Sequence, residues 1–314
     1  MIKSLIVIQI FLIIANCSVT SLKTNQIERG IPYIYQISDL DKNKSTPIKF
    51  YKFISADWEV AREGLINLND PISKSNKLEK GTEKIQIYTY AIEHPLHGVY
   101  FIDSGVSVEF LGKEKPISGM IGSVMNIGKL KVLNTSRDIV SKNKFRVRGI
   151  FFTHMHMDHI MGVSDFMDDV QLITGPGENG KKSFVNSIIQ GTNERLIGED
   201  REINELVFNE KSNFFGLNAI DYFGDKSFII LYSPGHTVGS LAFLINSESG
   251  YQLILGDTCH TEFGWIHNVT PGEFTEDQQM NKVSLNSLQS LAKSIPGIQV
   301  HPGHQSLSQS VEKD

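Results

Sequence analysis

Thr153-His154-Met155-His156-Met157-Asp158-His159 is the most informative stretch of this 314-residue sequence. It directly follows the apolar run 147–152, which has the length and the Ile and Phe content of a buried strand. Side chains alternate along an extended chain, so the first two histidines point to the same side and can reach one metal ion. The Asp-His pair comes at the following turn, which can direct it to a second ion. The spacing H-x-H-x-D-H therefore indicates a metal site.

Three later segments each add a polar residue after a strand-like run. His236 stands in a Ser-Pro-Gly-His sequence, where Pro and Gly allow a sharp turn, and Asp257 follows Leu-Gly. His304 ends the segment His301-Pro302-Gly303-His304. Together with the first segment they supply five histidines and two aspartates from four strand ends. Nitrogen and oxygen ligands of this kind suit Zn²⁺, and Fe and Mn stay open as alternatives.

The rest of the chain alternates short apolar runs with loops, which predicts sheets covered by helices, an α/β sandwich. Residues 246–250 are typical of a hairpin turn. Helical spacing of apolar residues over 278–295 predicts a helix that ends at Pro296-Gly297, and 185–196 is a second candidate helix. Residues 69–84 and 116–131 read as loops. The expected strands are 48–54, 85–92, 99–102, 147–152, 170–174, 228–232, 241–245 and 251–255.

Composition excludes several classes of protein. The chain has 30 Lys and Arg against 35 Asp and Glu, a formal net charge of −5, which argues against a dedicated nucleic-acid binder. It has two cysteines, Cys17 and Cys259, too few for a disulfide scaffold or a Cys-rich zinc cluster.

The N-terminus predicts export. Residues 5–15 form an apolar run that is too short to cross a membrane and fits the core of a signal peptide covering residues 1–17. Ile14-Ala15-Asn16-Cys17 resembles a lipobox, from which Asn16 departs. Lipidation of Cys17 and cleavage nearby by an ordinary signal peptidase both stay open. We expect a periplasmic protein or a membrane-anchored lipoprotein whose residues 18–314 form a single domain.

The motifs together resemble the metallo-β-lactamase-fold hydrolase superfamily. H-x-H-x-D-H, a later Pro-Gly-His, a Gly-Asp and a terminal Pro-Gly-His occur in the expected order between about Ile85 and His304. The resemblance implies an αββα sandwich with two metal ions in a cleft at the edges of the sheets. It implies a first metal held by His154, His156 and His236, a second held by Asp158, His159 and His304, and Asp257 as the bridge between them.

Two further residues near these motifs take expected roles from the resemblance. Asp103, in Phe101-Ile102-Asp103-Ser104-Gly105, matches the Asp-Thr/Ser-Gly turn of the family and would orient the metal loop. A plain turn residue is the alternative from spacing alone. His301 would be a neighbouring or surface residue, because the terminal histidine of the family lies in Pro-Gly-His.

The bridging position indicates the branch of the superfamily. Asp257 occupies it and Cys259 does not, which separates the chain from lactamases that use a Cys ligand. The resemblance therefore favours glyoxalase II-type thioesterases, lactonases and related esterases. Residues 91–105 look like acyl-homoserine-lactonase-type enzymes, but His260 replaces the Tyr that these carry three residues after the bridging Asp. A catalytic role for His260, as a donor to an oxyanion or leaving group, and a structural role both stay open.

The expected activity is that of a hydrolase with two Zn²⁺ ions that cleaves a small lactone, ester or thioester. A hydroxide shared by the two metals would attack the carbonyl carbon. Asp257 would hold the metal pair, and Asp158 would orient the nucleophile or pass its proton. The alternatives are a β-lactamase or an RNA-processing nuclease of the same fold, or an exported lipoprotein that binds metal without catalysis. The acidic balance weighs against nucleic acid as a partner; the sequence does not indicate an oligomeric state.

Overall fold

The computed structural model describes residues 17–33, 47–209 and 212–308, which contain two β-sheets. The first sheet contains β1 (Thr24–Ile27), β3 (Lys49–Ala61), β4 (Thr82–His94), β5 (Gly98–Ile102), β6 (Lys131–Val132), β7 (Val147–Phe151), β8 (Gln171–Thr174) and β9 (Ile203–Leu206). The second contains β2 (Ile31–Pro32), β10 (Asn218–Asp221), β11 (Phe228–Tyr232), β12 (Leu241–Ser247), β13 (Gly250–Gly256) and β14 (Gln299–Pro302). Their strand orders are β1-β9-β8-β7-β5-β4-β3-β6 and β14-β13-β12-β11-β10-β2.

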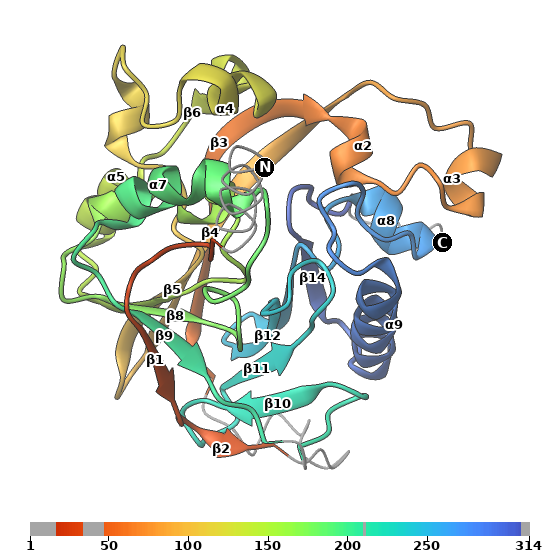
Figure 1. Ribbon diagram of the computed structural model, residues 1–314. Helices are drawn as coiled ribbons and strands as arrows, with labels where there is room; N and C mark the ends of the chain where they lie inside the picture. The colour runs from red at the N-terminus through yellow and green to blue at the C-terminus, as the bar shows by residue number, and fades with distance from the viewer. Residues whose placement is uncertain (1–16, 34–46, 210–211, 309–314) are drawn as a thin grey trace, which may run out of the picture.

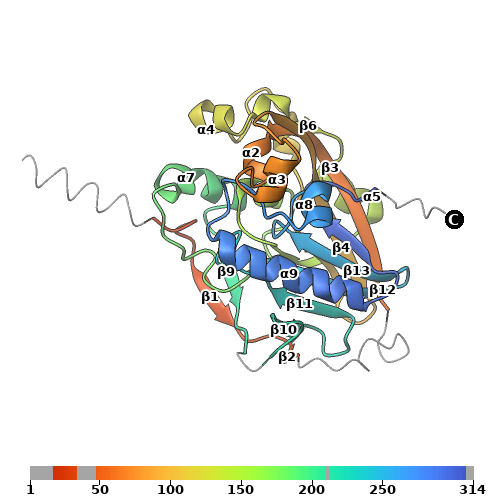
Figure 2. The same cartoon turned by 90° about the vertical axis from the view of Figure 1, so that its right-hand side faces the viewer.

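Helices cover the outer faces of the two sheets (Figure 1). The α-helices are α2 (Arg62–Leu65), α3 (Pro71–Ser75), α4 (Gly119–Val124), α5 (Ser136–Asn143), α6 (Met157–Ile160), α7 (Asn186–Ile197), α8 (Glu262–His267) and α9 (Gln278–Ser294). Three short 3₁₀ helices are η3 (Val108–Leu111), η4 (Ile127–Lys129) and η5 (Val163–Asp165). In Figure 2, α9 lies across the strands of the second sheet. The expected αββα sandwich is confirmed.

Three apolar cores separate the four layers. The core between the sheets is built from side chains such as Phe151, Phe228 and Phe243, all fully buried. A second core joins the first sheet to its helices, including α5 and α7, and a third joins the second sheet to α9. Leucines at helical spacing on α9 face that third core, and burying each contributes about 1.5–3 kcal/mol. They are Leu285, Leu288 and Leu291.

Strand direction decides where the metal-ligating residues meet. In the first sheet β5, β7 and β8 run parallel to one another. In the second sheet β11 and β13 are both antiparallel to β12, and β14 is parallel to β13, so these three strands also share a direction. Residues that follow β7, β11, β13 and β14 therefore gather at one edge of the sandwich.

The structure confirms the predicted strands and both predicted helices, and it adds β1, β2, β6, β9, β10 and β14, which were not among the expected strands. Three predicted segments also differ in detail. The hairpin turn is shorter than 246–250, because β12 and β13 pair as far as Ser247 and Gly250. The expected loop 69–84 holds α3 and the start of β4, and 116–131 holds α4 and η4. β3 and β4 pair from Lys49 with Glu93 to Ala61 with Thr82, well beyond their apolar runs. In these outer halves, charged side chains interrupt the apolar pattern by which a strand is recognised in the sequence. The backbone N–H and C=O groups of the two strands nevertheless hydrogen-bond to one another.

The expected signal peptide falls almost entirely outside the described residues, which begin at Cys17. Cys17 is a half-buried free cysteine. Across the described part of the chain, every helix is too short or too polar to cross a bilayer.

Candidate metal centre

The loop that leaves β7 carries four of the seven expected ligands. His154 is fully buried, and α6 starts directly after His156, which turns Asp158 and His159 back toward the sheet edge. Asp103, at the end of β5, holds this loop from the neighbouring strand. Its backbone is left-handed (φ 56°), a conformation that Asp tolerates better than most residues, and its Oδ1 accepts the N–H of Thr153 at 2.8 Å.

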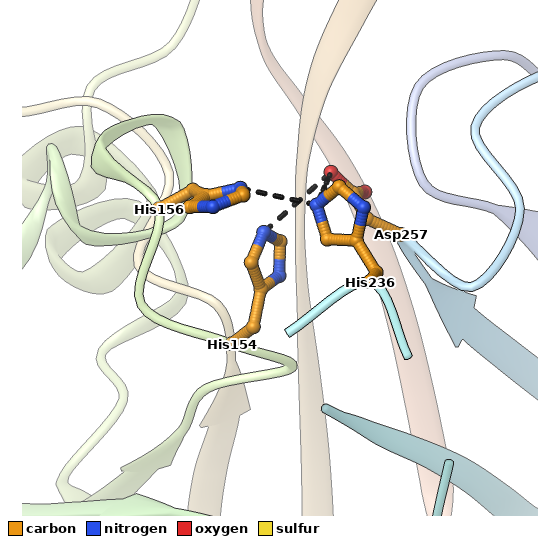
Figure 3. Close-up of side chains that lie close together, drawn as sticks. All are labelled: His154, His156, His236 and Asp257. Carbon is orange, nitrogen blue, oxygen red and sulfur yellow. Dashed lines mark hydrogen bonds and ion pairs between the residues drawn. The ribbon is translucent and has the colours of Figure 1, made fainter. Parts of the chain in front are cut away.

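Asp257 lies at the centre of the site. Its Oδ2 is 3.6 Å from Nε2 of both His154 and His236. The same oxygen is 3.3 Å from Nε2 of His159 and 3.2 Å from Nε2 of His304. One carboxylate oxygen thus faces two groups of histidines, which is the position of a bridging ligand. Figure 3 shows it together with the first group, His154, His156 and His236.

The first group consists of His154, His156, His236 and Asp257, with one ligand atom from each within 4.8 Å of the others. Nδ1 of His156 and Nε2 of His236 are 3.0 Å apart. Ligand atoms on a tetrahedral zinc ion with 2.0–2.1 Å bonds stand about 3.3 Å apart. The buried Nε2 of His154 has no hydrogen-bond partner among the described residues, so this donor set fits a metal ion.

The second group consists of Asp158, His159, Asp257 and His304, again within 4.8 Å. Oδ2 of Asp158 is 3.3 Å from Nε2 of His304 and 3.6 Å from Nε2 of His159. The buried Nε2 of His159 has no hydrogen-bond partner in the described part of the chain. The two groups match the assignment expected from the motifs, and they share Asp257.

Hydrogen bonds on the far side of the rings orient the histidines of the second group. Nδ1 of His159 donates to Oδ2 of Asp103 at 2.8 Å, and Nδ1 of His304 donates to the carbonyl oxygen of Gln86 at 3.1 Å. Each bond fixes the ring so that Nε2 faces the site. Asp103 is therefore placed to orient the metal loop, rather than to serve only as a turn residue.

A buried glutamate that the motifs did not reveal joins the ligand loops of the two sheets. Oε1 of Glu178 accepts the N–H of Met155 at 2.7 Å, and Oε2 accepts the hydroxyl of Thr237 at 2.7 Å and the N–H of Gly239 at 2.9 Å. It connects the residue between His154 and His156 to the residue after His236. Its one signal in the sequence is its place in a Gly-Pro-Gly-Glu turn after a buried strand.

The two Pro-Gly-His segments need their glycines. Gly235 has φ of 136°, which a residue with a side chain rarely adopts, and a Cβ there would overlap the backbone of Asn281. A Cβ on Gly303 would overlap Oδ1 of Asp257. Glycine thus allows the terminal segment to lie against the central carboxylate.

Electrostatics differ between the two groups. Burial holds the pKa of His154 and His236 well below the usual value and lowers that of His156 to about 4, so these rings are neutral. In the second group burial also disfavours charge, but Asp257 and Asp158 outweigh it and raise the pKa of His304 to about 10. Asp103 and Asp257 likewise raise the pKa of His159 well above its usual value. In the metal-free chain, protons on these rings balance the carboxylates, and a metal ion would displace them.

His260 also reaches the centre. It is buried, its Nδ1 donates to the carbonyl oxygen of Leu65 at 3.1 Å, and its Nε2 is 2.9 Å from Oδ2 of Asp257. That contact lacks hydrogen-bond geometry, so Nε2 has no hydrogen-bond partner among the described residues. The ring centroid is 5.0 Å from that of His236 and 5.3 Å from that of His304. His260 therefore faces both groups.

Two other residues lie apart from the ligands. His301 is buried rather than on the surface, because its Nε2 pairs with Oε1 of Gln252 at 2.8 Å and its ring packs near Phe50 and Tyr90. The alternative of a surface residue was wrong. Cys259 is fully buried and belongs to neither ligand group; burial raises the pKa of its thiol to about 12.

A groove of about 650 Å³ borders the second group at His304. The outer halves of β3 and β4 and residues 304–306 form much of its wall. Its apolar lining includes Trp58, Ile85 and Tyr88, and its charged lining contains both lysines and carboxylates: Lys84, Lys129, Lys131, Asp57, Glu59 and Glu262. Its volume is that of a small-molecule site.

Comparison with known proteins gives a family match over most of the chain. The model of the Metallo-beta-lactamase superfamily matches residues 83–304. Among solved structures, a quorum-quenching N-acyl homoserine lactone lactonase superposes with a TM-score of 0.58 at 17% identity, covering 83% of this chain and 93% of the lactonase. At that identity the likeness shows the fold alone.

Curated relatives match over part of their length. "Cytochrome P450 monooxygenase mpaDE" of Penicillium roqueforti is 32% identical over 127 residues, which are 36% of this chain and 14% of that protein. A hydroxyacylglutathione hydrolase of Shewanella loihica is 27% identical over 172 residues, 54% of this chain and 52% of the hydrolase. The matched regions thus cover at most about half of these two relatives.

Proposed function

Because the chain belongs to the metallo-beta-lactamase superfamily, we propose that it is a metal-dependent hydrolase that cleaves a small lactone, ester or thioester. The observation that carries the proposal is the position of Asp257, whose Oδ2 lies within 3.6 Å of ligand nitrogens from both histidine groups. A site built for one metal ion does not need a carboxylate oxygen shared by two groups. This arrangement supports a binuclear centre.

Each ion would have its own residues in this proposal. His154, His156 and His236 would hold the first ion, and Asp158, His159 and His304 the second, with Asp257 between them. The nitrogen and oxygen donors favour zinc, while Fe and Mn remain alternatives. When bound, two such ions supply a water that is deprotonated near neutral pH and a Lewis acid for the substrate carbonyl.

The remaining chemistry falls to side chains of the chain itself. Asp158 keeps 16% of its side chain exposed, against 4% for Asp257, so it is the carboxylate that reaches the solvent side and can accept or pass a proton. His260, held by the Leu65 carbonyl, faces the reacting region and can bind the leaving group or the oxyanion. Asp103 and Glu178 keep the ligand loops in place.

The groove beside His304 supports a small-molecule substrate. The hydroxyacylglutathione hydrolase relative supports a thioester, and the lactonase shares the fold. The net charge of −5 weighs against nucleic acid. We further propose that the chain is exported, which the apolar run 5–15 supports.

A hydrolysis panel on the metal-loaded full chain tests the proposal. The panel contains an N-acyl homoserine lactone, a glutathione thioester, an aryl ester, a β-lactam and an RNA. We expect hydrolysis of a lactone, ester or thioester, and loss of both metal and activity in Asp257→Asn, whereas the exposed control Asp200→Asn keeps both. No hydrolysis of any member by a chain that holds two metal ions, or cleavage of RNA alone, would overturn the proposal.

A further inference from the structure

Large apolar side chains are exposed just before α7 and in its first turn. Phe184, Val185 and Ile188 are 55%, 58% and 45% exposed. The buried side chains of α7, among them Leu196 and Ile197, pack into the core beside the first sheet. The three exposed side chains face solvent instead. Single exposed apolar residues are common, whereas three within five positions suggest a surface that contacts a partner.

Lysines accompany this cluster. Lys181 and Lys182 are exposed directly before it. Lys181 pairs with Glu276 at 3.3 Å, and Lys182 has no carboxylate partner in the described part of the chain. Glu199 and Asp200 lie beyond the far end of α7, about 20 Å along the chain from Phe184 at helical rise. We call Lys181, Lys182, Phe184, Val185 and Ile188 the α7 surface.

The first described residues of the chain lie beside this surface. The carbonyl oxygen of Cys17 accepts the N–H of Ser183 at 3.2 Å. The carbonyls of Ser18 and Val19 accept the side-chain amides of Gln190 at 3.0 Å and Asn193 at 3.1 Å. Four residues of the segment 179–193 thereby fix the chain from Cys17 onward, including Asn179, which binds Thr20. The described chain thus begins, at Cys17, beside the α7 surface.

We propose that the α7 surface rests on an anionic phospholipid membrane, at the side of the molecule where the described chain begins. The inference relies on the proposed export and is independent of the hydrolase activity. Apolar side chains of this kind enter the boundary between headgroups and acyl chains, and each nearby lysine adds attraction to anionic lipid. A single acyl chain, such as a lipid on Cys17 would supply, anchors a protein only marginally. A second membrane contact beside Cys17 would therefore strengthen binding.

Tryptophan quenching tests this orientation on the metal-loaded full chain. Val185→Trp reports on the α7 surface, and Val283→Trp, at an exposed apolar position of α9, is the matched control. The probe is a vesicle of phosphatidylglycerol and phosphatidylcholine whose acyl chains carry bromine, which quenches tryptophan at short range. We expect Val185→Trp to be quenched at least about twofold more than Val283→Trp, because only the former residue would enter the bilayer.

Two further variants separate the contributions to binding. Adding Phe184→Ser or Lys182→Glu to Val185→Trp should bring the quenching toward the control, and replacing phosphatidylglycerol with phosphatidylcholine should weaken it. Equal quenching of the two tryptophans, or failure of the full chain to bind the vesicles, would overturn the proposal. So would a dimer in sedimentation that Phe184→Ser dissociates, since the surface would then bind a second copy.

Discussion

Oε1 of Glu178 accepts the main-chain N–H of Met155 at 2.7 Å, between the two histidines of the first ligand group. Its other oxygen, Oε2, accepts hydrogen bonds from the hydroxyl of Thr237 and the N–H of Gly239, which follow His236 in the chain. A single carboxylate thus joins the ligand loops of the two sheets. Because Glu178 is buried and surrounded by donors, it would position the candidate metal ligands without being one of them.

Glu178→Gln should therefore weaken metal binding. Glutamine has one oxygen and one NH₂ group where glutamate has two oxygens. The NH₂ group cannot accept a hydrogen bond, so at least one of the three hydrogen bonds to Glu178 is lost. We expect zinc affinity to fall about 10- to 100-fold, as for other residues that orient metal ligands. Competition with a chromophoric chelator measures it. Glu202→Gln, an exposed glutamate that pairs with Lys23, is the control, and equal affinity in Glu178→Gln and the wild type would contradict the positioning role.

The gathering of the seven candidate ligands could be predicted from the sequence because it follows from local spacing. H-x-H-x-D-H and the two Pro-Gly-His segments bring their own turn geometry, and buried strands before them fix where they point. Glu178, the carbonyl of Leu65 and the carbonyl of Gln86 could not be found this way. Each acts on a ligand loop far away in the chain, at separations of 23, 195 and 218 residues. The pairing of β7 with β8 brings Glu178 to Met155, and the packing of the two sheets brings the other two pairs together.

Metal binding should release protons. In the metal-free chain the carboxylates of Asp257 and Asp158 raise the pKa of His304 to about 10, and Asp103 and Asp257 raise that of His159 well above its usual value. Both rings therefore carry a proton at pH 7 that a metal ion must displace, and the affinity should rise with pH, about 10- to 100-fold per pH unit.

Calorimetry of zinc binding in buffers of different ionisation enthalpy counts these protons. We expect between one and two protons released per chain at pH 7, and fewer as the pH approaches 10. His304→Ala should remove one of them, whereas His267→Ala, at an exposed histidine, should change nothing. A binding enthalpy that is the same in all buffers would show that the rings are neutral before the metal arrives.

His301 should make folding sensitive to acid. Burial, with a smaller contribution from Lys52, lowers its pKa to about 3, so the folded chain keeps it neutral while the unfolded chain protonates it below pH 6.5. The unfolded state thus binds more protons between these values, and stability falls as the pH falls. The loss from this group is at most about 1.4 kcal/mol per pH unit.

His301→Gln removes this titration and keeps an N–H that can donate to Gln252. Urea unfolding of the metal-free chain at pH 6.5 and pH 5 should show a smaller loss of stability in His301→Gln than in the wild type, by about 1–2 kcal/mol. His267→Gln, at an exposed position, should behave as the wild type. An identical pH dependence in His301→Gln would mean that the buried ring is protonated at a normal pKa.

His260 lies against the central carboxylate of the site, and its proposed part in the chemistry can be tested directly. Its Nδ1–H is held by the Leu65 carbonyl and its Nε2 faces Oδ2 of Asp257, so the ring is aimed at the reacting region while standing outside the two ligand groups. If it binds the leaving group or the oxyanion, His260→Phe should keep two metal ions and lower kcat about 100-fold with KM little changed. His260→Gln, which can still donate, should recover part of the rate. Metal analysis and steady-state kinetics on the best substrate of the panel distinguish this from a structural role, in which both variants would lose metal and stability together.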